Sequence, residues 1–146
     1  MRRFNVVLHS ETGWFHPVDH AIHDHPDLSR EAALNFNHMA DGTGTILFHI
    51  EGDQAALERV LADEPDVLAA DVFAVEGEGL RAYVRIGPNN VATRLMTTIS
   101  EYGLDVERPL EITNEGGLKV TVMGDLESMR EAAIDRPAGV DIELDE

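Results

Sequence analysis

One repeated pattern restricts the fold more than any other property of this 146-residue chain. The pair Gly52-Asp53 recurs 72 residues later as Gly124-Asp125, and an amphipathic stretch with helical spacing follows each copy. An aspartate in this position is a typical N-cap. The repeat therefore predicts two copies of one supersecondary unit in a single chain.

The apolar pattern around the first copy predicts six elements. They are a strand at 4–8, a helix from Pro17 that ends before Pro26, strands at 33–39 and 45–51 around the turn 41–44, a helix capped by Asp53, and a strand at 67–75. The glycine-rich segment 76–79 then interrupts the pattern. This order of elements is strand, helix, strand, strand, helix, strand.

The second half predicts the same order. Its elements are a strand at 81–86, a helix capped near Asn89 or Asn90 that stops at Gly103, strands at 106–113 and 118–123, a helix capped by Asp125, and a strand at 140–144. We therefore expect an α/β (α+β) fold of two tandem ferredoxin-like βαββαβ units with antiparallel sheets, covering 1–77 and 78–146. A single mixed α/β domain, whose halves agree by chance, is the alternative.

Charge is the most unusual bulk property. The chain has 28 acidic and 11 basic residues, a formal net charge of -17, and Lys119 is its only lysine. Such a surface repels itself in dilute buffer, and molar salt screens that repulsion. The composition is typical of a protein adapted to high salt, with an acidic protein from a low-salt cell as the alternative. Nucleic-acid binding by this chain alone is disfavoured, because phosphate contacts need clustered basic side chains.

The sequence excludes several classes of site and location. With no cysteine, the chain has no disulfide, thiolate zinc site or cysteine nucleophile. No apolar run is long enough for a signal peptide or a membrane helix, so we expect a cytoplasmic protein without a membrane partner. Gly42-Thr43-Gly44 has too few glycines for a phosphate-binding loop, and no serine lies in a nucleophile-elbow context. We therefore expect that the chain is not an enzyme.

Histidine is concentrated before the first predicted hairpin. His16 and His20 are four residues apart, a spacing that on a helix could hold a divalent transition metal ion between two imidazoles. The apolar stripe of Val18, Ala21 and Ile22 argues against this, because it turns those rings toward water. Ordinary solvated histidines explain the spacing equally well.

A pocket at one edge of the first sheet is a second interpretation. In a ferredoxin-like unit the first two predicted strands end at the same edge, which would bring His9 and His38 near the loop that carries Trp14, Phe15 and His16. The resulting candidates for ligand binding are Trp14, Phe15 and His16, and those for metal binding are His9, His16, His20 and His38. Such a pocket would suit a transition metal, haem iron or an anionic ligand. Hydrogen-bonded or surface histidines remain the alternative.

Several short motifs resemble a known family. They are Trp14-Phe15-His16-Pro17, Ser29-Arg30-Glu31-Ala32, the turn 40–44, the Gly52-Asp53 helix start, Asn114-Glu115-Gly116-Gly117-Leu118 and Gly124-Asp125. Together they resemble the N-terminal domain of haloarchaeal bacterio-opsin activator-like regulators over essentially the whole chain. In that family a C-terminal helix-turn-helix binds DNA, and this chain stops at Glu146 without such a segment.

The resemblance implies a signal-input or dimerisation domain of a transcription regulator, with DNA contacted only through a C-terminal domain outside this chain. Two functions follow. The domain either senses a metal or small ligand through its first half, or acts purely as a protein–protein interaction module. For the second function we expect a homodimer that covers exposed sheet faces at residues such as Val7, Leu47 and Val84.

Overall fold

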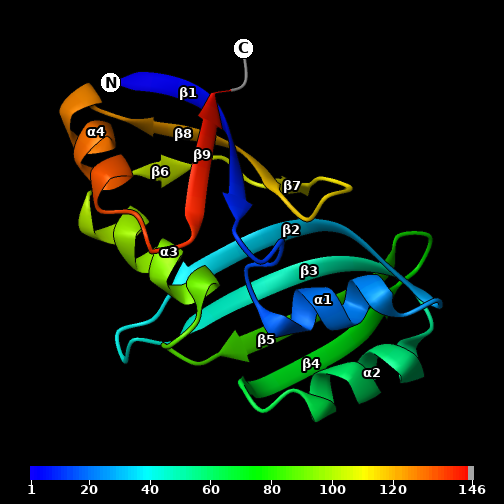
Figure 1. Cartoon of the computed structure of the whole chain (residues 1–146). Helices are drawn as coiled ribbons and strands as arrows, with labels where there is room; N and C mark the ends of the chain where they lie inside the picture. Colours follow the sequence, from blue (N-terminus) through cyan, green and yellow to red (C-terminus); the bar gives the residue numbers. More distant parts are fainter. Residues whose placement is uncertain (145–146) are drawn as a thin grey trace.

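The computed structural model describes residues 1–144, which form four helices and nine strands in one open sheet (Figure 1). The strands are β1 (Arg2–Ser10), β2 (Leu28–His38), β3 (Gly44–Gly52), β4 (Val67–Val75), β5 (Gly79–Ile86), β6 (Asp105–Val106), β7 (Leu110–Ile112), β8 (Leu118–Gly124) and β9 (Val140–Leu144). The helices are α1 (Pro17–Asp24), α2 (Gln54–Asp63), α3 (Val91–Glu101) and α4 (Leu126–Ile134). The described strands pair antiparallel throughout, which confirms the expected α+β class.

The strand order differs from that of two independent tandem units. It is β4-β5-β3-β2-β7-β8-β1-β9, with β6 also pairing with β8. In a ferredoxin-like unit the first strand lies between the third and the fourth. Here β5 fills that place between β3 and β4, whereas β1 fills it between β8 and β9. The two halves have therefore exchanged their first strands, and tandem independent units are not confirmed.

Because of this exchange, residue 77, the predicted boundary between two units, does not lie between two separate sheets. That residue lies in the turn between β4 and β5, whose strands pair directly from Val75 opposite Gly79 onward. The two half-sheets meet elsewhere, through a short pairing of β2 with β7 at Ala32 and Ala33. Buried residues of both half-sheets belong to one core cluster, including Leu8 of β1 and Phe48 of β3. The halves therefore fold around a shared core.

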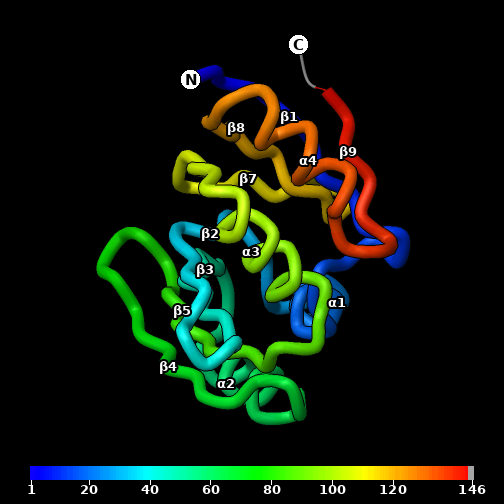
Figure 2. The backbone as a smooth tube through the Cα atoms, turned by 90° about the vertical axis from the view of Figure 1, so that its left-hand side faces the viewer, coloured from blue at the N-terminus to red at the C-terminus, as the bar shows by residue number. Residues whose placement is uncertain are grey.

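The helices pack against the strands of the sheet at different positions. Figure 2 shows α2 with the β4–β5 hairpin toward one end of the molecule, α4 with β8 and β9 toward the other, and α3 between them. Helix α2 packs against β4 and α1, while α3 packs against β2 and β3. Side chains of α3, of α4 and of the inner faces of both half-sheets surround one common space.

Helices α2, α3 and α4 begin at caps that the sequence predicts. Asp53, Asn90 and Asp125 each accept a hydrogen bond from a backbone N–H of the first turn of α2, α3 and α4 respectively, as expected. The cap of α1 was not expected: His16 fills that place, and its Nδ1 accepts the N–H of Val18 at 3.1 Å. A histidine predicted as a ligand is therefore used as a helix cap.

The boundaries of two strands differ from expectation. Strand β2 begins five residues earlier than predicted, at Leu28, and contains register shifts between Arg30 and Ala32 and between Ala33 and Asn35. These irregularities break the alternation of apolar and polar residues on which the prediction depends. The strand expected at 106–113 is two short strands, β6 and β7, separated at Pro109, which has no N–H to donate to a neighbouring strand. Within residues 1–144 no helix has the length and apolarity that crossing a membrane requires.

Candidate functional site

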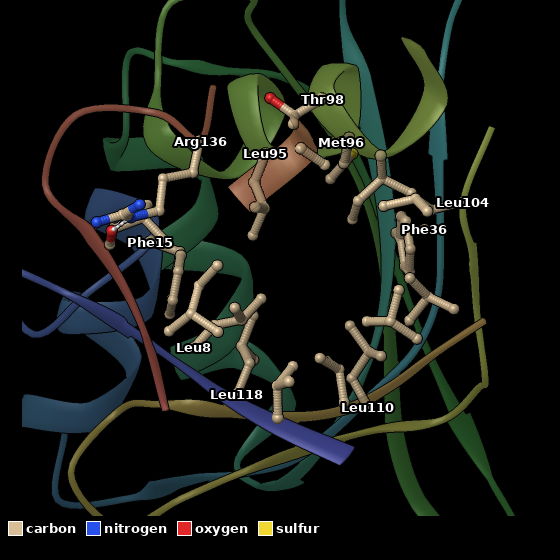
Figure 3. Close-up of a pocket in the computed structure, with 18 of the residues that line it drawn as sticks. Leu8, Phe15, Phe36, Leu95, Met96, Thr98, Leu104, Leu110, Leu118 and Arg136 are labelled. Carbon is tan, nitrogen blue, oxygen red and sulfur yellow. Dashed lines mark hydrogen bonds between the residues drawn. The ribbon is translucent and has the colours of Figure 1, made fainter. Parts of the chain in front are cut away.

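A partly open cavity of about 310 Å³ lies between the sheet and helices α3 and α4, and it is the strongest candidate for a binding site. Apolar side chains surround it in Figure 3, where Leu8, Phe36, Leu95, Leu110 and Leu118 point toward a common space. They come from β1, β2, α3, β7 and β8. A space of this size with mainly apolar walls is what small-molecule sites in proteins have in common.

The cavity exists because both half-sheets turn their inner faces toward it. Along β1, Phe4, Val6 and Leu8 alternate with residues of the other face, and Val120 and Val122 do so along β8. Helices α3 and α4 bring Leu95 and Met129, among others, to the opposite wall. Strand exchange is essential here, since β1 carries the apolar side chains of the N-terminal segment into the wall of the second half-sheet.

A polar network fixes one end of the cavity wall. The Oδ2 atom of Asp66, in the loop before β4, accepts hydrogen bonds from His16 Nε2 and from Asn90 Nδ2, each at 2.8 Å. Since His16 Nδ1 accepts the Val18 N–H, its Nε2 carries the proton that it donates to Asp66. The Ala92 N–H also donates to the Phe15 carbonyl at 3.0 Å. These bonds tie the first turns of α1 and α3 together.

Of the three residues predicted to bind a ligand, only Phe15 lines the cavity. Phe15 is 5% exposed and lies on the opposite side of the cavity from Phe36 (Figure 3). The His16 side chain is 1% exposed, and both of its ring nitrogens are engaged in the polar network. His16 therefore holds the loop that carries Phe15, and no ring nitrogen is left for a ligand.

Trp14, the third predicted ligand residue, packs beside the cavity wall. Its ring lies 5.3 Å from the Arg30 guanidinium and about as close to two histidines of α1, with centroid distances of 5.0 Å to His20 and 4.8 Å to His23. The turn before β8 packs closely against the Trp14 ring, since a Cβ on Gly116 would lie 3.0 Å from it. Trp14 thus supports the position of Arg30.

The structure does not gather the four predicted metal ligands. His9 contacts Glu143 on β9 at 3.0 Å, His20 contacts Asp24 one turn along α1 at 3.0 Å, and the exposed His38 ends β2. Residues 1–144 contain no group of three or more histidine, aspartate or glutamate side chains arranged to hold a metal ion. The predicted divalent metal or haem at His9, His16, His20 and His38 therefore has no geometric support.

A buried ion pair, which the sequence did not single out as a site, belongs to the cavity wall. The carboxylate of Asp19 on α1 lies 3.5 Å from the guanidinium of Arg30 on β2, and their side chains are 10% and 5% exposed. Burial raises the pKa of Asp19, against the opposing effects of Arg30 and of the His16 environment. Burial likewise lowers the pKa of Arg30. Arg30 stands in the Ser29-Arg30-Glu31-Ala32 motif, which was the only sequence signal that pointed to it.

The faces expected to pair in a dimer are mostly covered within the chain. Val84 is fully buried and Val7 is 9% exposed, while Leu47 is half-buried. Exposed large apolar side chains lie elsewhere: Leu68 and Phe73 on β4 are 54% and 43% exposed, Ile134 at the end of α4 is 77% exposed, and Leu144 on β9 is 66% exposed. Exposed faces for an interaction therefore exist, but not at the residues predicted.

No curated protein matches this chain. A family model, described as HVO_0513_N, N-terminal, matches residues 16–146. The match begins at the cap of α1 and includes Arg30, Asp66 and Asn90, and with them most of the cavity wall. Since the model spans most of the chain, this protein belongs to the HVO_0513_N family of N-terminal domains.

Proposed function

We propose that this chain is the signal-input domain of a transcription regulator and that it binds a small ligand in the cavity between α3, α4 and the two half-sheets. The cavity is the observation that carries the proposal, because about 310 Å³ lined mainly by apolar side chains is room that a well-packed core does not leave. Membership of a family of N-terminal domains and the resemblance to bacterio-opsin activator-like regulators support a regulatory role over a catalytic one.

The position of the cavity suggests how a ligand would act. Its wall includes Phe36 and Phe48 from the first half-sheet and Leu118 and Val120 from the second. Between the half-sheets, β2 and β7 pair only briefly. A ligand that contacts both halves favours the arrangement in which they are held together. Binding would thereby change the placement of whatever follows β9, which in such a regulator is the DNA-binding segment.

The charge of the chain supports the same division of labour. With a net charge of -17, this domain repels nucleic acid, so DNA contacts belong to a C-terminal domain outside the chain. The acidic surface fits a cytoplasm with high salt, such as that of a haloarchaeon. In this proposal the domain catalyses no reaction, and its output is a change in the regulator's DNA-binding state.

Ligand binding is tested with the neutral apolar dye N-phenyl-1-naphthylamine in molar KCl. We expect saturable binding with about one site per chain. Val120→Phe, which places a ring in the cavity, should abolish binding, whereas Thr121→Phe places the same ring on the opposite face of β8 and should not. Equal binding by wild type and Val120→Phe would contradict the proposal.

The regulatory role needs a separate measurement in cells. Transcript profiles are compared between the wild type, a deletion of the gene that encodes the chain, and the Val120→Phe strain. We expect the deletion to change the transcript levels of a set of genes, and the Val120→Phe strain to change the transcript levels of the same genes. Unchanged transcripts in the deletion strain would remove the transcription role.

A homodimer is the second candidate function, and the edge strand β4 favours it. β4 contains a single charged residue, Asp71, and exposes Leu68 and Phe73, while Tyr83 on the adjacent β5 is 46% exposed. An uncovered apolar edge strand is a template for pairing with a second copy of the chain. Light scattering in molar KCl should give a dimer mass for wild type and a monomer mass for Phe73→Asp. A wild-type monomer would exclude this candidate.

A further inference from the structure

The charged side chains of the cavity wall have the opposite balance to the chain as a whole. The described wall residues with a formal charge are Asp19, Arg30, Arg130 and Arg136, three positive and one negative. The whole chain has 28 acidic and 11 basic residues. Although the chain has few basic residues, three arginines lie around one apolar space, and the surroundings of the cavity are therefore favourable for an anion.

Arg30 is the buried member of this set, and it has an unused donor. Its side chain is 5% exposed, and its Nε atom is buried without a hydrogen-bond partner in the described structure. The Asp19 carboxylate approaches the Nη1 atom at 3.5 Å and leaves the Nε–H free. A buried donor without an acceptor is destabilising, and such groups are rare in folded proteins. An acceptor supplied by a ligand would satisfy this one.

We propose that the cavity binds an apolar monocarboxylate whose carboxylate accepts a hydrogen bond from Arg30 Nε and whose hydrocarbon part fills the apolar space. This inference rests on the proposed function, since it names the ligand class for the same cavity. At ~30 Å³ for each water-sized group, the cavity has room for roughly ten non-hydrogen atoms. Octanoate has about that size and serves as the probe.

The neighbours of Arg30 determine which ligands are disfavoured. A cation would meet three arginines, and a ligand rich in polar groups would leave them unpaired against walls such as Phe36 and Leu95. Asp19 opposes a carboxylate at the same place, and its raised pKa lessens this repulsion because the buried carboxyl accepts a proton more readily. Removing the Asp19 charge should therefore strengthen octanoate binding.

The test compares octanoate with 1-octanol, which has a similar chain and no charge, by displacement of N-phenyl-1-naphthylamine in molar KCl. Wild type should bind octanoate at least tenfold more tightly than 1-octanol, since a buried charged hydrogen bond is only weakly screened by salt. Asp19→Asn should raise octanoate affinity and leave 1-octanol unchanged. Arg30→Gln alone leaves Asp19 buried without its partner, so the double variant Asp19→Asn/Arg30→Gln, which keeps the local charge balanced, is the decisive one.

In the double variant, octanoate affinity should fall at least tenfold below that of Asp19→Asn, with dye and 1-octanol binding retained within about threefold. Equal affinities of wild type for octanoate and 1-octanol would overturn the inference and leave the cavity as a site for neutral ligands. Unchanged octanoate binding in the double variant would overturn the role of Arg30. If the dye itself does not bind to wild type, the proposed function fails first, and the two failures are thus distinguished.

Discussion

Replacing His16 by alanine should destabilise the protein without affecting any metal content. The side chain is 1% exposed and makes two hydrogen bonds, from the Val18 N–H to its Nδ1 and from its Nε2 to Asp66. Loss of the helix cap costs about 1 kcal/mol. Loss of the hydrogen bond to Asp66 costs about 1–2 kcal/mol, which is at the lower end for bonds to a charged group because the Asp66 side chain is 33% exposed. The expected total is about 2–3 kcal/mol.

Thermal unfolding followed by circular dichroism in molar KCl measures this loss. For a domain of this size it corresponds to a decrease in Tm of about 5–10 °C. His20→Ala is the control, because the His20 side chain is 52% exposed and makes only an exposed ion pair with Asp24 and a ring contact with Trp14, so its loss should cost less than about 1 kcal/mol. His16→Asn keeps a side-chain acceptor suited to the cap and should recover about 1 kcal/mol.

Two results would refute this reasoning. The first is a His16→Ala protein as stable as His20→Ala, which would mean that the buried network contributes nothing. The second is stoichiometric divalent metal in wild type that His16→Ala loses, measured by elemental analysis. A metal ligand needs a free ring nitrogen, and both nitrogens of His16 are engaged.

Three further predictions concern single positions. Gly52→Ala should prevent stable folding, because at a φ of +133° the added Cβ would lie 1.9 Å from the Asp27 carbonyl oxygen. Gly77→Ala has open space around the added Cβ and should lower the free energy of unfolding, measured with urea, by only about 1 kcal/mol. The N–H and hydroxyl of Ser128 donate to Asp125 and hold the pKa of Asp125 below its ordinary value, so the stability that Asp125 adds should be complete near neutral pH and disappear as the pH falls through that lowered pKa. The free energies of unfolding of wild type and Asp125→Ala, measured with urea, should therefore become equal in acid. The bond from the Tyr102 hydroxyl to Asp135 raises the pKa of Tyr102 to about 12, and Asp135→Asn should return it toward the ordinary value in an ultraviolet titration, whereas an unchanged titration would mean that the bond is absent in solution.

Part of the candidate site was predictable from sequence. Phe15, one of the three residues expected to bind a ligand, lines the cavity, and the Ser29-Arg30-Glu31-Ala32 motif contains the buried Arg30. The histidine cluster was misleading, because its members are near one another in sequence yet project from β1, the α1 cap, the α1 surface and the end of β2. Sequence spacing predicts a shared site only within one regular element.

The sequence by itself determined the elements, because caps, glycine turns and apolar periodicity are local. Asp53 and Asp125 cap the helices that they were expected to cap, Asn90 is the cap where Asn89 or Asn90 was expected, and the repeated order of elements is present. Only the tertiary structure decided which half-sheet each first strand joins. Strands β1 and β5 occupy equivalent places in the repeat, so the local pattern cannot tell one strand's partners from those of the other. Their exchange depends on which apolar faces cover one another in the shared core, and the same packing leaves the cavity between the halves.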